Sequence, residues 1–343
     1  MRFLLITVLS IFFLVSFSCN RPDGSTEKEA IDSLASKDSA DPQIRALTEK
    51  INADPTNPEQ FFLRSNVFQQ LGNLAASFRD MSAAIALDSS NMKYYFAIAD
   101  IYLKGGSADG AIDAFLQIIR KDPANTEALI KLSKVYFYKK DYQNSMLQLT
   151  RVQEIDQDNF EAWFIRGLNF KEMGDTGRAI TAFQKSVQAK TDFYDGYMQL
   201  GLITSNKKNS MAAQYFDNAI RIDSTVTEAY YAKAMFYQDH GALEKAKATY
   251  QQLIRVNPQY EFSYFNLGYV YILQDSIDMA YRMFDFAIKV KPAYAEAYFY
   301  RGLCSREKGN FDQAIADFRQ ALTLKPGYEA AQKELNTLNQ STK

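Results

Sequence analysis

Large apolar, small and polar side chains recur in this chain with a period of 34 residues between residues 58 and 328. In each period, apolar residues first follow one face of a helix, then a turn residue intervenes, and a second helical pattern follows. The pattern therefore predicts eight pairs of helices. We number them repeats 1 to 8, and they comprise residues 58–91, 92–125, 126–159, 160–193, 194–226, 227–260, 261–294 and 295–328.

Three positions of the repeat keep one side-chain size throughout. Position 8, in the first helix, is always Gly, Ala or Ser, and position 20, in the second helix, is always Ala or Ser. Position 24 is always large and apolar, as in Phe183, Tyr250 and Phe284. Small residues allow the two helices to approach closely, and the large residues fill the remaining space. We expect these three positions to form the core of each repeat.

The complete pattern is present in repeat 8, as Tyr298, Gly302, Gly309, Ala314, Phe318, Ala321 and Pro326. This order of bulky, small, turn, small, bulky and proline positions resembles the tetratricopeptide repeat (TPR). The resemblance covers 271 residues. It implies an all-α fold, a right-handed superhelical solenoid of about eight helix-turn-helix repeats with terminal capping helices. The expected turn residues are Gly72, Gly106, Gly174, Gly241 and Gly309.

An array of this kind exposes apolar surface at both ends unless further helices cover them. Residues 42–57 have the pattern of a single degenerate second helix and predict an N-terminal capping helix. Residues 329–343 continue the pattern beyond repeat 8 and predict a C-terminal capping helix with a short tail.

The N-terminal residues have the pattern of an export signal. The apolar run at residues 3–17 follows one arginine and is too short to span a bilayer as a helix. We predict a lipoprotein signal peptide at residues 1–18, because Ser16-Phe17-Ser18-Cys19 resembles a bacterial lipobox. Ser16 stands where Leu is commonest and Phe17 is bulky, so ordinary signal cleavage with Cys19 as a bystander stays open.

In the lipobox interpretation, Cys19 carries acyl chains such as palmitate, which hold the protein on a membrane. Residues 19–41 then form a polar linker, which is rich in Ser, Asp, Glu and Lys and contains no aromatic residue. These features predict a lipid-anchored protein of the bacterial cell envelope. Asn20 rather than Asp follows the cysteine, which by analogy with enteric bacteria indicates the outer membrane.

The charge balance and the small numbers of histidine and cysteine residues limit the kinds of partner and site that we expect. The 39 basic and 40 acidic residues nearly cancel, which gives no long-range attraction to nucleic acid. One histidine (His240) and two cysteines are too few for a four-ligand Cys/His zinc site. His240 lies in a predicted turn, where we expect it to be solvated. Cys304 lies in a predicted helix, where we expect it to pack against its neighbours. We therefore expect a protein that is not an enzyme and that needs no cofactor or metal.

The resemblance to TPR proteins implies a concave surface, which is lined by positions 2, 5, 9, 12 and 13 and binds peptides or protein segments. Position 2 is acidic in six repeats, which we attribute to the helix dipole rather than to a groove for a basic partner. Position 9 is polar in repeats 1 to 3 and apolar in repeats 4 to 8, and contiguous apolar surface marks interaction sites. The predicted partner-binding groove comprises Met198, Leu202, Tyr231, Met235, Phe262, Phe265, Tyr269, Ile272, Phe299 and Leu303.

Other interpretations of these apolar positions stay open. The side chains can pack against the neighbouring repeat, the C-terminal helix can fold into the groove, or a second copy of the chain can cover it as a homo-oligomer. The carboxylate clamp of chaperone-binding TPR proteins needs Lys at position 5 and Asn at position 9, and no repeat here has both.

The predicted function is a membrane-anchored TPR scaffold or adaptor, which binds protein or peptide partners in the bacterial cell envelope through its concave groove. One alternative is a self-associating structural protein of the envelope. A glycan-binding or hydrolytic protein is a further alternative, but it needs a polar pocket that the sequence does not predict.

Overall fold

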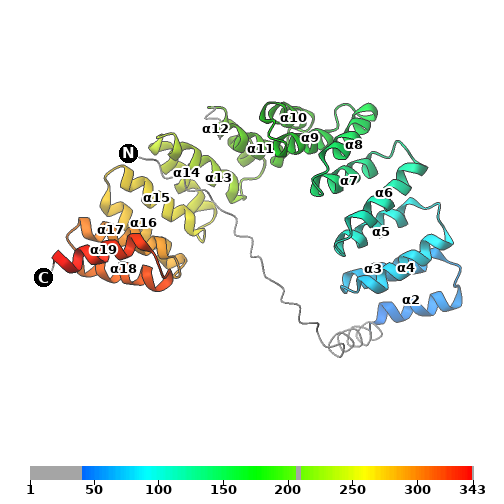
Figure 1. Cartoon of the computed structure of the whole chain (residues 1–343), viewed down its shortest axis with the longest axis horizontal. Coiled ribbons are helices and arrows are strands. Elements are labelled where there is room, and N and C mark those ends of the chain that lie inside the picture. Colours follow the sequence, from blue (N-terminus) through cyan, green and yellow to red (C-terminus); the bar gives the residue numbers. More distant parts are fainter. Residues whose placement is uncertain (1–40, 206–209, 342–343) are drawn as a thin grey trace. The chain divides into compact units, whose positions relative to one another are not determined.

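The computed structural model describes residues 41–205 and 210–341, and within these ranges it contains eighteen helices and no strand (Figure 1). The predicted all-α fold is confirmed. The predicted signal peptide, Cys19 and the polar linker as far as residue 40 lie outside the described residues. No helix in the described part of the chain is both long and apolar enough to cross a membrane.

Each repeat consists of two helices, and each first helix begins at the first residue of its repeat. The first helices are α3 (Pro58–Gln70), α5 (Met92–Lys104), α7 (Thr126–Tyr138), α9 (Phe160–Glu172), α11 (Tyr194–Ser205), α13 (Thr227–Asp239), α15 (Glu261–Leu273) and α17 (Ala295–Glu307). The second helices are α4 (Leu74–Leu87), α6 (Ala108–Lys121), α8 (Tyr142–Ile155), α10 (Thr176–Ala189), α12 (Ala212–Ile222), α14 (Leu243–Val256), α16 (Ile277–Val290) and α18 (Phe311–Leu324). Two further helices, α2 (Pro42–Ala53) and α19 (Glu329–Ser341), precede and follow the repeats.

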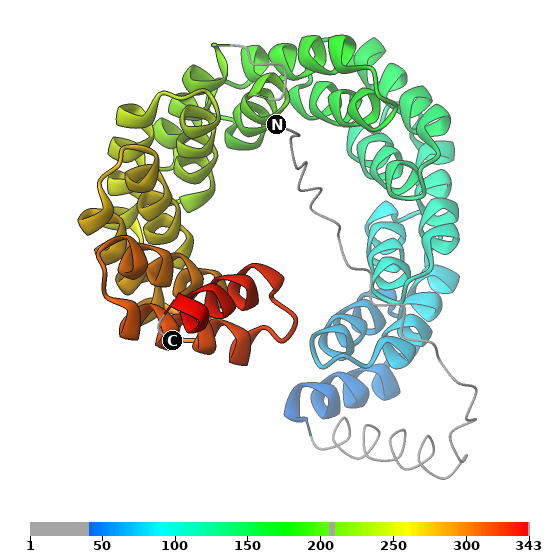
Figure 2. The same ribbon diagram turned by 60° about the vertical axis from the view of Figure 1, so that its left-hand side comes forward.

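The helices form two compact units, which divide between Ala128 and Leu129 within α7. In the first unit, each helix from α2 to α6 packs on the next one in sequence. In the second unit, the same holds for each helix from α8 to α19, and Figures 1 and 2 show this succession from green to red. Stability within each unit therefore comes mainly from contacts between neighbours in sequence, as in other repeat arrays.

The three positions of constant side-chain size form the core, as predicted. All eight residues at position 20 and all eight at position 24 are fully buried. The glycines at position 8 face the ring at position 24 of their own repeat. A Cβ atom on Gly201 would lie 2.4 Å from Phe216 Cε1, and one on Gly268 would lie 2.9 Å from Phe284 Cε1. Larger side chains at position 8 have no room, which explains why this position is always small.

Position 15 forms the turn between the two helices with a left-handed backbone. The five predicted turn glycines have φ angles between 71° and 81°. Repeats 3 and 7 place Lys140 (φ 61°) and Asp275 (φ 57°) at the same position. A positive φ is uncommon for residues with a side chain, so the packing of the two helices imposes this conformation on repeats that lack the glycine.

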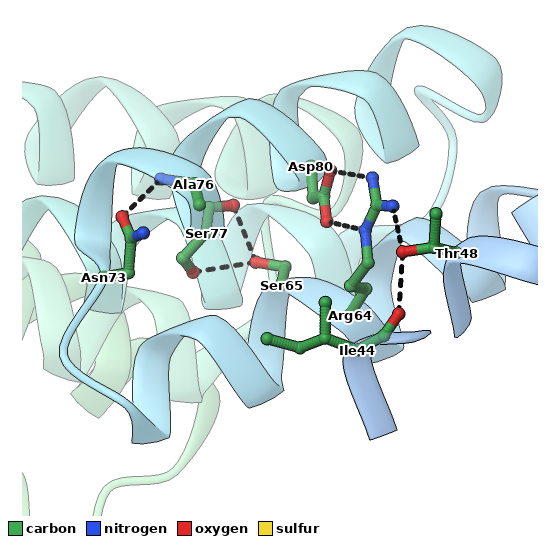
Figure 3. Close-up of polar contacts among 8 residues, drawn as sticks. All are labelled: Ile44, Thr48, Arg64, Ser65, Asn73, Ala76, Ser77 and Asp80. Atoms are coloured by element: carbon green, nitrogen blue, oxygen red, sulfur yellow. Dashed lines mark hydrogen bonds and ion pairs between the residues drawn. The ribbon is translucent and has the colours of Figure 1, made fainter. Parts of the chain in front are cut away.

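In repeats 1 and 8, an arginine at position 7 joins the two helices of the repeat to the helix before them. In repeat 1, Arg64 Nε and Nη2 donate to the Asp80 carboxylate at 2.7 and 2.8 Å (Figure 3). Arg64 Nη1 donates to Thr48 Oγ1 of α2 at 2.9 Å. Repeat 8 has the same arrangement, since Arg301 bonds Asp317 of its own repeat and Asp285 of repeat 7.

The two terminal helices cover the apolar ends of the repeats. Ile44 and Ile51 of α2 are buried where α2 packs on α3. Ala331, Leu335 and Leu338 of α19 are buried with the core of repeat 8. Both helices thus close the apolar surface that an end repeat would otherwise expose to water.

Candidate functional site

The ten residues of the predicted groove differ in their exposure. Met198 and Phe299 are buried, with 9% and 8% of their surface exposed, and therefore belong to the core. Leu202 and Phe262 are exposed, at 41% and 36%. The other six are half-buried: Tyr231, Met235, Phe265, Tyr269, Ile272 and Leu303.

Packing within and between repeats holds several of the half-buried side chains. The centroid of the Phe265 ring lies 5.1 Å from that of Tyr294 and 5.5 Å from that of Tyr300, which join α15 to repeat 8 and its entry turn. The Met235 sulfur accepts a hydrogen bond from the Tyr250 hydroxyl at 3.1 Å within repeat 6. These residues stabilise the array, so the surface available to a partner is smaller than the predicted set.

Apolar side chains nevertheless remain exposed on α11 and α15. Leu202, Phe262 and Leu273 expose between 36% and 49% of their surface. The ring of Phe262 lies beside the ring of Tyr260, with centroids 5.5 Å apart. Desolvation by burial raises the pKa of Tyr260 and of Tyr231 above the ordinary value of a tyrosine.

A cavity of about 370 Å³ lies on the first helices of repeats 3 to 5, and we call it the aromatic pocket. Its walls come from α7, α9, the turn that precedes α11, and the first residues of α11. Seven of its eleven lining residues occupy positions 2, 5, 9, 12 or 13, which the resemblance assigns to the concave groove. The lining residues are Lys134, Phe137, Tyr138, Phe160, Glu161, Phe164, Ile165, Leu168, Lys190, Phe193 and Asp195.

Three aromatic rings in edge-to-face contact form one wall of the aromatic pocket. The Phe193 ring centroid lies 5.1 Å from that of Phe160 and 4.9 Å from that of Phe164, with the ring planes strongly inclined. Phe164 in turn contacts the fully buried Phe183 at 5.7 Å, which anchors the wall in the core of repeat 4. At the rim, Tyr138 is 80% exposed. The pocket is therefore preformed by core packing and has one freely accessible aromatic side chain at its edge.

The charged residues of the aromatic pocket differ in their pairing. Lys134 Nζ lies 2.5 Å from Glu161 Oε1, so this cation is neutralised by a neighbour from the next repeat. Lys190 Nζ lies over the Phe160 ring, 4.6 Å from its centroid, and has no carboxylate partner among the described residues. Asp195, in the first turn of α11, has no cationic partner within the same ranges. The pocket thus offers one cation and one carboxylate to a ligand.

None of the eleven residues that line the aromatic pocket is among the ten residues of the predicted groove. The groove was predicted from the apolar residues at position 9 of the later repeats, whereas repeat 3 has the polar Lys134 at that position. Phe160 and Phe193 stand at the first and last positions of repeat 4, outside the positions used for the groove. The available signal was the adjacent aromatic pair Phe137 and Tyr138, because positions 12 and 13 belong to the groove positions that the resemblance implies.

The surroundings of His240 and Cys304 indicate structural rather than catalytic or metal-binding roles. His240 follows α13 as an exposed residue, and its Nδ1 lies 2.7 Å from the Phe236 carbonyl oxygen. Cys304 is buried at 1% exposure, and this burial raises the pKa of its thiol to about 12. Within residues 41–205 and 210–341, no group of three or more His, Cys, Asp or Glu residues could hold a metal ion.

Three family models match the sequence, and each is described as a tetratricopeptide repeat. The matched residues are 62–126, 160–193, 227–260 and 295–328. They lie in both compact units and include part of the aromatic pocket.

The curated proteins that are similar to this chain include further tetratricopeptide repeat proteins. The chain is 24% identical to human tetratricopeptide repeat protein 13 over 155 residues, which is 45% of this chain and 14% of that protein. It is 24% identical to a TPR repeat-containing protein of Methanocaldococcus jannaschii over 231 residues, 62% of this chain and 40% of the relative. The chain therefore spans less than half the length of these curated relatives.

Among solved structures, the C-terminal part of a TPR repeat-containing protein from Cytophaga hutchinsonii is similar, with a TM-score of 0.62 and 20% identity. The match covers 71% of this chain and 99% of that one. At this level of identity, the similarity shows the fold that the two chains share.

Proposed function

The chain is a tetratricopeptide repeat protein, and from this premise we propose that it is a membrane-anchored scaffold that binds protein or peptide partners in the bacterial cell envelope. The TPR fold is typical of protein–protein interaction and is generally non-catalytic. The aromatic pocket is the observation that carries the binding part of the proposal. It places exposed and half-buried apolar side chains at the positions that line the groove of such arrays.

The anchor and the location rest on the N-terminal sequence. Residues 1–18 have the pattern of a signal peptide, Cys19 ends a lipobox-like segment, and Asn20 favours the outer membrane. An acylated Cys19 would hold the described helices near the membrane surface through the polar linker. We propose that the scaffold gathers its partners there.

Replacing Cys19 by alanine is expected to release the protein from the membrane. Acyl chains contribute about 0.8 kcal/mol per buried CH₂ group, and the alanine variant carries none of them. Membrane fractionation and metabolic labelling with a radioactive fatty acid measure the two effects. If the variant keeps both the label and the membrane attachment, the lipoprotein part of the proposal is wrong.

A double substitution in the aromatic pocket, Tyr138→Ala with Phe160→Ala, is expected to reduce capture of envelope partners by about thirtyfold or more. Truncation of an aromatic anchor in an interface typically costs about 2 kcal/mol or more. The measurement is affinity purification of the full-length chain from detergent-solubilised envelope, with circular dichroism to verify that the helices are intact. The matched control is Leu147→Ala with Phe286→Ala, since both side chains are exposed on second helices.

Two outcomes would contradict this part of the proposal. Unchanged capture by the pocket variant would show that the partners bind elsewhere. A molar mass that rises with concentration in light scattering, and falls for the pocket variant, would favour the self-associating alternative instead.

A further inference from the structure

We propose that the aromatic pocket binds a peptide segment in which a large apolar side chain is next to a carboxylate side chain. This inference rests on the proposed function and names the chemistry of the partner at that site. It follows from three features of the pocket: its size, its ring wall and the state of its charged residues.

The size and the ring wall define the apolar part of the ligand. A volume of about 370 Å³ is at the lower end of the range for small-molecule sites, so the pocket holds one large side chain and adjoining backbone rather than a long segment. The rings of Phe160, Phe164 and Phe193 form a fixed apolar wall. An aromatic side chain can contact this wall in the inclined or offset arrangement that aromatic pairs favour, and a leucine side chain can bury its apolar surface against the same rings.

Lys190 defines the charged part of the ligand. Its ammonium group lies 4.6 Å from the Phe160 ring centroid and 5.9 Å from that of Phe193, so the cation is held directly beside the ring wall. Lys134 is paired with Glu161 and is therefore not the free cation of the pocket. A carboxylate that reaches Lys190 must lie beside the apolar wall, which requires an acidic residue next to the apolar one.

Asp195 limits how acidic the segment can be. Its carboxylate has no cationic partner among the described residues, and it repels a second acid at the α11 side of the pocket. It also offers an acceptor to a backbone N–H of the incoming peptide. One acidic residue beside an apolar anchor is therefore favoured over an acidic run.

A random seven-residue peptide display library is the probe for this proposal, and the full-length chain is the target. The selected peptides are expected to share a Phe, Tyr, Trp or Leu directly before or after one Asp or Glu. Synthetic peptides of the selected sequence, labelled with fluorescein, are then titrated by fluorescence anisotropy. Amidation of the acidic side chain, Asp to Asn or Glu to Gln, is expected to weaken binding about tenfold, as is typical for a charge-assisted hydrogen bond.

The Lys190→Gln variant separates a specific role of this cation from a general effect of charge. It is expected to weaken binding of the acidic peptide about tenfold and to leave binding of the amidated peptide unchanged, since the two changes remove the same interaction. Lys185→Gln is the matched control, because Lys185 lies over the Trp163 ring at 4.1 Å in the same repeat but outside the pocket. Tyr138→Ala, at an 80% exposed position, tests the rim without affecting the core.

Several results would overturn the inference. One is a consensus without an acidic residue, or with a basic residue at the expected acidic place. Another is a Lys190→Gln variant that binds both peptides as the wild type does. A wild-type dimer that Tyr138→Ala converts to a monomer would show that a second copy of the chain occupies the pocket.

Failure of this inference is distinguishable from failure of the proposed function. If selected peptides bind and neither Lys190→Gln nor Tyr138→Ala weakens them, the chain binds peptides at another surface, and only the inference falls. If the library yields no binder and envelope partners are not captured either, both proposals are wrong.

Discussion

Replacing Arg301 by methionine is expected to lower the free energy of unfolding by about 3–5 kcal/mol, because it leaves a buried carboxylate without its cation. Asp317 is 2% exposed and receives hydrogen bonds from Arg301 Nε at 3.0 Å and Nη2 at 2.7 Å. Arg301 Nη1 also donates to Asp285 of repeat 7 at 2.6 Å, so the substitution loosens the contact between repeats 7 and 8. Urea unfolding measures the loss, and hydrogen exchange should locate it in these two repeats.

Two further variants test the physical reason for this loss. Lys233→Met removes the cation at position 7 of repeat 6, but its partner Asp217 is about half exposed, so the expected cost is only about 0–1 kcal/mol. The double variant Arg301→Met with Asp317→Leu replaces both members of the buried pair by apolar groups and should regain most of the stability. A double variant as unstable as Arg301→Met alone would show that the loss comes from packing rather than from an unpaired charge.

Replacing Phe284 by alanine is expected to cost about 3–5 kcal/mol, because it removes a fully buried ring and leaves a cavity in repeat 7. The ring of Phe284 lies against Gly268 and within 5.5 Å of the rings of Phe265 and Tyr300, measured between centroids. Thermal or urea unfolding measures the effect. Phe286→Ala is the control two residues further on, since Phe286 is 44% exposed, and it should cost much less.

The close approach of Gly268 and Phe284 allows a test of their coupling. Gly268→Leu alone is expected to cost about 1–3 kcal/mol, since even a Cβ atom would lie 2.9 Å from the Phe284 ring. With Phe284→Ala, the added leucine enters the space that the ring has left, and the double variant should be more stable than the sum of the two losses predicts. Strict additivity would show that the two residues do not share one space. Hydrogen exchange that rises uniformly along the chain would contradict stabilisation by neighbouring repeats.

The fold of the repeats was predictable because its determinants are local. Two helices and a turn within 34 residues are specified by the spacing of apolar, small and turn residues, and the pattern occurs eight times. The core positions were predictable for the same reason, since position 8 meets position 24 of the same repeat, as Gly201 meets Phe216. The left-handed turns at Lys140 and Asp275 carry no glycine signal and appear only once helix packing imposes the φ angle.

The binding surface depends on contacts that the repeat pattern does not contain. Phe265 and Leu202 both lie at predicted groove positions. Phe265 is half-buried because rings from repeat 8 and its entry turn cover it, whereas Leu202 stays exposed. The aromatic pocket likewise brings together Lys134 from one repeat and Lys190 from the end of the next.

The sequence by itself determined the all-α repeat fold, the core positions and the capping helices, and it carries the lipobox-like segment that awaits its test at Cys19. Only the tertiary structure decided which apolar side chains remain accessible and that Lys190 of the aromatic pocket has no carboxylate partner among the described residues. The physical reason is that periodicity specifies the face of a helix on which a residue lies, whereas its exposure depends on side chains from neighbouring repeats. Phe299 shows this difference, because it lies at a groove position and is 92% covered, with only 8% of its surface exposed.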